Sequence, residues 1–233
     1  MESQSTRPAR SVGPVKRRII IGVTAVFGIA VLAGAFLWLV PIFTVDNYRV
    51  EGAEHTSDDE VIAAAGIPLG TNLLRANLPE SSAAVATLPW VKQATVARDF
   101  PHTVAIDVVE RNAVFAADFA DGTHLIDGDG EPFVIADAPP GVVLIDGLAE
   151  DNPTAYRTAA RFLSQLAPEV RGQVQRIHFA SDQFMEVTTT GDRVIVVGSA
   201  DNLPAKAQTF AVVLQMEGAR IDITNPRQVA VAP

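Results

Sequence analysis

The chain has 233 residues, of which 48% are hydrophobic, and it carries a formal net charge of −9 and no cysteine. This length suits one or two compact domains. The acidic balance argues against a nucleic-acid partner, because phosphate binding needs clustered lysine and arginine, and the lack of cysteine excludes disulfides, zinc–thiolate sites and thiol nucleophiles.

The first forty residues combine a basic stretch with an uncharged one. Residues 1–18 hold five basic residues and one acidic residue, whereas the 22 residues 19–40 hold no charge. As a helix, the uncharged stretch would rise about 33 Å, which matches the ~30 Å hydrocarbon core of a bilayer. Trp38 would then lie near the lipid–water boundary. We therefore predict a transmembrane helix over 19–40, a basic cytoplasmic tail over 1–18 and an acidic extracytoplasmic part.

Two alternatives for the apolar stretch are less consistent with the residues. A cleavable signal peptide has an apolar core of only ~7–15 residues, and here the apolar run continues past the cleavage-like Ala33-Gly34-Ala35 to Val40. A buried helix of a soluble protein is disfavoured as well, because basic residues abut the stretch on one side only.

The next elements are predicted to be a strand, two helices and a hairpin. Pro41 ends the membrane helix because its ring cannot continue the hydrogen-bond ladder. The predicted ranges are a strand over 43–50, a helix between Ser57 and Gly66, a helix over 79–87, and two strands on either side of Phe100-Pro101. In the hairpin, Ala94, Val96 and Phe100 are expected to share one face of the first strand, and Val104, Ile106 and Val108 one face of the second.

Three carboxylates, Asp58, Asp59 and Glu60, open the first of these helices. They could be read as a metal or acid–base site. Negative side chains are also favoured at a helix N-terminus, where they interact with the exposed N–H groups. We adopt this simpler interpretation.

Beyond Arg111 the chain is rich in short strands. The "DGDG" of residues 127–130 is predicted to be a hairpin turn, because a calcium hand needs a 12-residue loop that ends in a bidentate glutamate between helices. The predicted strands cover 114–117, 124–126, 133–135, 142–145, 174–179, 185–189, 194–197, 219–224 and 228–231, and the predicted helices cover 153–166 and 203–216.

No motif of catalysis or of phosphate binding is present in the sequence. The four histidines are scattered singly, and isolated histidines are more often structural or surface groups than ligands. We predict a non-enzymatic binding or scaffolding protein with no metal, no cofactor and no small-molecule substrate.

The stretch from Leu88 to Phe115, "LPWVKQATVARDFPHTVAIDVVERNAVF", resembles the signature of the FtsQ/DivIB family of bacterial cell-division proteins. The shared frame is Leu-Pro-Trp-Val, a strand ending in Arg98, an aromatic–proline turn and a strand ending in Glu110-Arg111. Other parts of the family are resembled by three further stretches: "YRVEGAEHTSDDEVIAAAGIPLGTNLL" upstream, "HLIDGDGEPF" downstream and "ARIDITNPRQVAVAP" at the end of the sequence. Gly198 and Lys206 also stand at positions expected for the family.

The resemblance implies an α+β protein with a single transmembrane helix. A POTRA domain of order β-α-α-β-β would cover 43–111, and a mixed, mainly antiparallel β domain with packed helices would cover 112–233. The family's members are septal scaffolds with a cytoplasmic N-terminus. They bind FtsB and FtsL and couple them to the septal peptidoglycan synthase pair FtsW and FtsI.

In related proteins the last strand region accepts a strand from FtsB. The resemblance therefore implies partner contacts at five residues near the end of the chain: Thr224, Asn225, Arg227, Gln228 and Val229. An edge strand has unpaired N–H and C=O groups that a partner strand can use. Thr224 stands where the family often has arginine, and an edge that binds nothing remains the alternative.

Two other functions stay open at this point. The first is a POTRA-bearing secretion or assembly chaperone, although such proteins usually carry several POTRA modules and this chain has room for one. The second is an anchored cell-wall enzyme, which would act on peptidoglycan.

Overall fold

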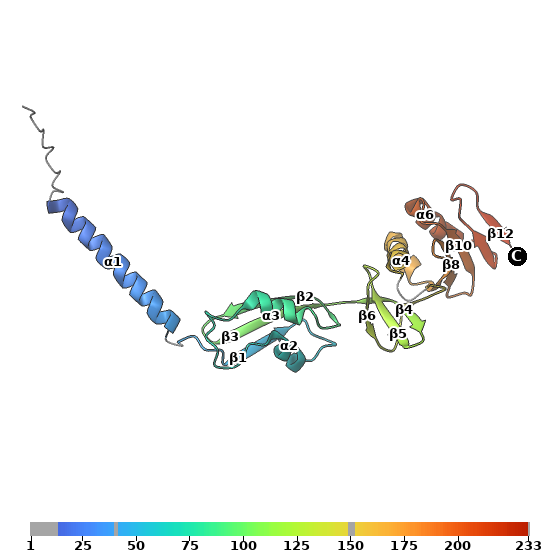
Figure 1. Ribbon diagram of the computed structural model, residues 1–233. Helices are drawn as coiled ribbons and strands as arrows, with labels where there is room; N and C mark the ends of the chain where they lie inside the picture. The colour runs from blue at the N-terminus through green and yellow to red at the C-terminus, as the bar shows by residue number, and fades with distance from the viewer. Residues whose placement is uncertain (1–13, 40–41, 149–151, 233) are drawn as a thin grey trace, which may run out of the picture. The chain divides into compact units, whose positions relative to one another are not determined.

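The computed structural model describes residues 14–39, 42–148 and 152–232 (Figure 1). The chain forms two compact units. The first takes in the described residues up to Glu51 together with 58–85 and 94–107, and the second takes in 52–57, 86–93 and the described residues from Val108 onward.

Helix α1 covers Pro14–Leu39, so the predicted apolar helix is helical over its described part, while Val40 and residues 1–13 of the predicted tail lie outside the described residues. Within the described part of the chain, no helix is both long and apolar enough to cross a membrane. The assignment of residues 19–40 to a membrane stays a prediction.

The first unit and the strands that run out of it follow the predicted order of strand, helix, helix, strand and strand. The elements are β1 (Asn47–Glu51), α2 (Asp58–Ala65), α3 (Leu78–Val85), β2 (Val91–Asp99) and β3 (Thr103–Glu110). The sheet order is β1-β3-β2, with β1 parallel to β3. This is the β-α-α-β-β pattern expected of a POTRA domain.

Burial in the hairpin confirms most of the predicted faces. Val104, Ile106 and Val108 are buried, as expected for one face of β3, and Val96 is buried in β2. The prediction for Phe100 is wrong, because β2 ends at Asp99 and Phe100 is 52% exposed. It lies in the turn, where its ring packs against the ring of Phe43 at 5.2 Å.

The second unit is built on a nine-stranded sheet of order β12-β11-β10-β9-β8-β7-β4-β5-β6. Its strands are β4 (Ala113–Phe119), β5 (Gly122–Asp127), β6 (Pro132–Ile135), β7 (Val143–Asp146), β8 (Val174–Ser181), β9 (Phe184–Thr189), β10 (Val194–Gly198), β11 (Arg220–Asp222) and β12 (Ala230–Ala232). The sheet is mixed: β4 with β7, β7 with β8 and β10 with β11 are parallel, and the other pairs are antiparallel.

In the described part of this unit, three helices connect the strands: α4 (Pro153–Gln165), α5 (Pro168–Arg171) and α6 (Leu203–Val213). The rings of Phe162 in α4 and Phe210 in α6 meet edge to face at 5.5 Å, and both side chains are fully buried in the core. The short α5 was not expected from the sequence.

The "DGDG" turn joins β5 to β6, so the turn interpretation is confirmed. The side chain of Asp127 is only 3% exposed, and its Oδ1 accepts the backbone N–H groups of Asp129 and Glu131. Its Oδ2 lies 2.6 Å from the guanidinium of Arg111. The carboxylate is therefore committed to the turn and to an ion pair.

Candidate partner-binding edge

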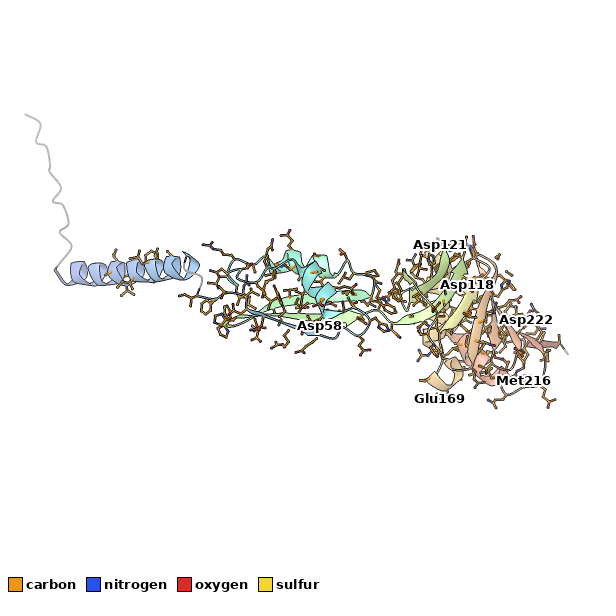
Figure 2. The ribbon with its side chains drawn as sticks, turned by 90° about the horizontal axis from the view of Figure 1, so that it is seen from below. Asp58, Asp118, Asp121, Glu169, Met216 and Asp222 are labelled. Atoms are coloured by element: carbon orange, nitrogen blue, oxygen red, sulfur yellow. The ribbon has the colours of Figure 1, made fainter. Side chains whose placement is uncertain are left out.

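Strand β12 is the end strand of the nine-stranded sheet, and β11 is its hydrogen-bonded neighbour. Ala230 pairs with Asp222, Val231 with Ile221 and Ala232 with Arg220. Figure 2 labels Asp222, which marks this end of the sheet. All three residues of β12 are exposed, and Val231 is 46% exposed although it is apolar.

The ladder decides which backbone groups of β12 face away from the sheet. On the segment that contains β11, the N–H of Ile223 donates to the carbonyl of Val196, and the C=O of Ala219 accepts the N–H of Val194. The backbone groups of the odd-numbered residues of β11 and its flanks therefore face β10. Successive residues alternate sides, so the groups of Arg220 and Asp222 face β12 and bond Ala232 and Ala230. The N–H and C=O of Val231 then point out of the sheet, where a partner strand can bond them.

The five residues predicted from the sequence lie in the turn between β11 and β12. The N–H of Thr224 donates to Asp222 Oδ1 at 2.8 Å, and the N–H of Arg227 donates to Asn225 Oδ1 at 3.1 Å. The N–H of Gln228 donates to the carbonyl of Asn225 at 2.9 Å. These bonds turn the chain back, as aspartate and asparagine side chains commonly do.

The turn residues differ in what they offer to a partner. Thr224, Asn225, Arg227 and Gln228 are exposed, whereas Val229 is partly buried and packs against the hydrophobic core. Four of the predicted side chains are therefore available beside the edge, and the fifth fixes the start of β12.

The predicted last strand, 228–231, is displaced toward the end of the chain, since the observed strand is Ala230–Ala232. The predicted strand contained Ala230 and Val231 but not Ala232, and the predicted partner contacts stopped at Val229, before the first residue of the observed strand. The alternation of valine and alanine continues to residue 232, and this signal would have extended the strand.

Lys206 lies buried close to this edge. Its side chain is in α6, and Nζ donates to the carbonyl of Ser199 at 2.8 Å, just beyond the end of β10. Burial lowers the pKa of Lys206, while the carboxylates of Asp201 and Asp222 act in the opposite direction. The lysine ties α6 to the end of β10.

The histidines of the second unit lie beside carboxylates rather than in clusters. His124 contacts Asp121, His178 contacts Asp146, and His55 contacts Glu110 at 2.8 Å. Among the residues that the structure describes, no group of three or more histidine, aspartate or glutamate side chains could hold a metal ion.

Comparisons with known proteins agree on one family. The family model described as "POTRA domain, FtsQ-type" matches residues 43–111. "Cell division protein FtsQ" of Mycobacterium leprae is 34% identical over 230 residues, which are 96% of this chain and 67% of the relative. The protein of the same name from Corynebacterium glutamicum is 34% identical over 216 residues, 91% of this chain and 96% of the relative.

Two further matches are more distant or less complete. "Cell division protein FtsQ" of Mycolicibacterium smegmatis is 33% identical over 213 residues, which are 90% of this chain and 63% of the relative. The solved extracytoplasmic domain of the division protein DivIB from Geobacillus stearothermophilus is 13% identical with a TM-score of 0.35, covering 44% of this chain and 87% of that one. The latter similarity is too low to bear on the fold.

Proposed function

Because this chain belongs to the FtsQ family of cell-division proteins, we propose that it is a septal scaffold that recruits and regulates homologues of FtsB and FtsL. Through them it acts on the septal peptidoglycan synthase pair FtsW and FtsI. The family consists of division scaffolds and is not an enzyme family, which argues against the cell-wall enzyme considered above.

The proposed scaffold is anchored by residues 19–40, with residues 1–18 in the cytoplasm and both units on the other side of the membrane. Support comes from the uncharged 22-residue stretch beside a basic cluster. The described part of this stretch is helical, because α1 covers Pro14–Leu39. The protein would gather at the division septum with its partners.

The observation that carries the partner proposal is the open edge of β12. The N–H and C=O of Val231 face away from β11, so a partner strand can extend the sheet there. The exposed side chains of Thr224, Asn225, Arg227 and Gln228 would give this contact its specificity, because main-chain bonds alone do not distinguish one strand from another.

A proline substitution tests this edge directly. Val231→Pro removes the outward N–H of β12. It leaves Ala230 and Ala232, the residues that pair with Asp222 and Arg220 of β11, unchanged. Loss of one intermolecular hydrogen bond of about 1.5 kcal/mol corresponds to about tenfold weaker binding. Calorimetry with the full chain in detergent and the FtsB/FtsL homologue measures the affinity, and circular dichroism checks the fold.

The opposite end of the same sheet offers a matched control. The N–H of Ala136 donates to Thr123, so the N–H of Ile135 in β6 faces outward, and Ile135 is 52% exposed. Ile135→Pro is therefore the same change at the other edge, and it should leave the affinity unchanged. Equal affinities of Val231→Pro and the unmodified chain would place the interface elsewhere, and equal losses in both variants would point to a general loss of sheet stability.

A further inference from the structure

Large apolar side chains are exposed together at one end of the first unit. Ile42 is 42% exposed, Leu69 is 62% exposed and Phe100 is 52% exposed. With Phe43, whose ring packs against Phe100, they form what we call the apolar tip. Single exposed apolar residues are ordinary, but a group of them on a soluble surface marks an interaction site.

The topology of the unit brings these residues to the same end. Strand β1 begins there, opposite the start of β3, because Asn47 pairs with Thr103. The turn that holds Phe100 precedes β3, and the connection that holds Leu69 follows the end of α2, which returns along the sheet from the far end of β1.

Hydrogen bonds hold the three segments of the tip in place. The N–H of Leu73 donates to Phe43 and the N–H of Gly70 donates to Val45, both at 2.8 Å. The N–H of Asp46 donates to the carbonyl of His102, also at 2.8 Å. The exposed side chains are therefore presented by a fixed backbone.

The carboxylates next to the tip have basic partners. Asp99 lies 2.6 Å from the guanidinium of Arg49, and Asp46 lies 3.5 Å from the ring of His102. The guanidinium of Arg49 offsets the charge of Asp99, which reduces the repulsion that this carboxylate would experience near an anionic surface.

The tip also lies next in sequence to the proposed membrane anchor. Ile42 follows Val40, the last residue of that anchor, with one residue between them. A chain spans at most about 3.5 Å per residue, so Ile42 can be no more than about 7 Å from the end of the anchor. Leu69 and Phe100 belong to the same fixed end of the unit.

We propose that the apolar tip is a membrane-docking surface, and that Leu69, Phe100 and Ile42 enter the interfacial layer of the bilayer that holds residues 19–40. This docking rests on the proposed anchor. Apolar side chains at the interface are favoured by about 25 cal/mol for each Å² removed from water, and the tether removes most of the entropic cost of bringing them there.

The lack of native cysteine allows a single label to be placed at will. We would prepare the full chain as Leu69→Cys, Asp58→Cys and Val26→Cys, each carrying nitrobenzoxadiazole. Asp58 is exposed at the start of α2, the end of that helix away from the tip, and Val26 lies in α1. The chains are reconstituted into phosphatidylethanolamine–phosphatidylglycerol vesicles that contain nitroxide-labelled lipid.

Nitroxide quenching at Leu69→Cys should be at least about threefold stronger than at Asp58→Cys, with a blue-shifted emission, and Val26→Cys should also be quenched. Adding Phe100→Asp should reduce the quenching at residue 69 to the level of residue 58, which excludes insertion by the label alone. Quenching at residue 26 but not at residue 69 would overturn the docking and leave the anchor intact. No quenching at residue 26 would instead overturn the anchor. A blue shift at residue 69 without quenching would mean a protein contact and would also overturn the docking.

Discussion

The hydroxyl of Ser82 lies 3.0 Å from the backbone nitrogen of Val96 and accepts its N–H, so a side chain of α3 occupies the outer edge of β2. The same hydroxyl donates to the carbonyl of Ala94 at 3.0 Å. Strand β2 is an end strand of its sheet. Serine thus takes the place of a neighbouring strand at this edge, which is one way to prevent unwanted pairing. The Val231 edge of β12 has no comparable cover among the described residues.

Replacing Ser82 with alanine should remove both bonds and leave the two backbone groups without their hydroxyl partner. Such a loss costs about 1–3 kcal/mol when the groups are partly buried. We expect a lower midpoint of urea unfolding and faster hydrogen exchange of the Val96 amide. Ser82→Thr, which keeps the hydroxyl, should exchange as the unmodified chain does. If the Val96 amide exchanges equally slowly in Ser82→Ala and Ser82→Thr, the hydroxyl does not cover this edge.

Glu110 closes a ring of hydrogen bonds at the end of β3. Its carboxylate accepts the backbone N–H groups of Glu54, His55 and Thr56, each at 3.0 Å, and lies 2.8 Å from the ring nitrogen of His55. Burial acts to raise the pKa of Glu110, but the hydrogen bonds outweigh it and lower the pKa from 4.5 to about 2.

Because the folded-state pKa of Glu110 lies below the unfolded value, its contribution to stability is present above pH 4.5 and is lost as the pH falls toward 2. A shift of this size corresponds to about 3 kcal/mol. Glu110→Gln should therefore unfold more easily at pH 7 and show a smaller loss of stability between pH 4.5 and 2. Denaturant unfolding between pH 2 and pH 7 measures the free energy of unfolding of each variant. Glu169→Gln, an exposed glutamate labelled in Figure 2, should behave as the unmodified chain, and parallel curves for all three proteins would contradict the assignment.

Gly147 has a steric reason to be glycine. Its φ is +80°, and a Cβ there would lie 2.2 Å from the carbonyl oxygen of Phe179. Gly141 has a similar φ of +85° but no atom within 4 Å of the same position. Both alanine variants carry the strain of a positive φ, about 1 kcal/mol.

Gly147→Ala should therefore be destabilised by at least about 2 kcal/mol more than Gly141→Ala, because the backbone of β8 must move to relieve the overlap. Thermal unfolding of the two variants side by side gives the difference. Similar melting temperatures would mean that the backbone at Gly147 lies further from the carbonyl of Phe179 than the structure shows.

Buried Lys206 should make the stability of the protein depend on pH in alkaline solution. Burial lowers the pKa of Lys206 in the folded state below its usual value of 10.5, so the unfolded chain binds the proton more tightly. Stability should therefore rise as the pH climbs from the folded-state pKa toward 10.5. Lys206→Met should lack this rise. Subtracting the two stability curves isolates it from the titration of other groups. Lys92→Met removes an exposed lysine and should keep the rise in stability. If the rise is absent from the Lys92→Met variant as well, it does not come from the titration of Lys206.

Local patterns in the sequence predicted much of the fold. The acidic first turn placed α2, Pro101 placed the turn between β2 and β3, and "DGDG" placed the turn between β5 and β6. Each of these depends on a few adjacent residues, whose backbone preferences act without reference to the rest of the chain. The resemblance of the hairpin to one family rested on the same kind of local information.

The partner edge shows where such information ends. The residues from Thr224 to Val229 carry the family pattern, yet they form a turn, because Asp222 and Asn225 bond the backbone and Val229 is drawn onto the core. That core is assembled from strands far away in the chain. No local preference could assign Val229 to it.

By itself, the sequence determined the order of the elements apart from α5, the uncharged stretch near the start and the family, because these follow from composition and from the spacing of neighbouring residues. The tertiary structure alone decided that Val231 faces outward, that Ser82 covers β2 and that Ile42, Leu69 and Phe100 gather at one end. Each of these depends on which distant strand or helix lies alongside. Hydrogen-bond direction and burial are properties of that pairing, and a single strand does not carry them.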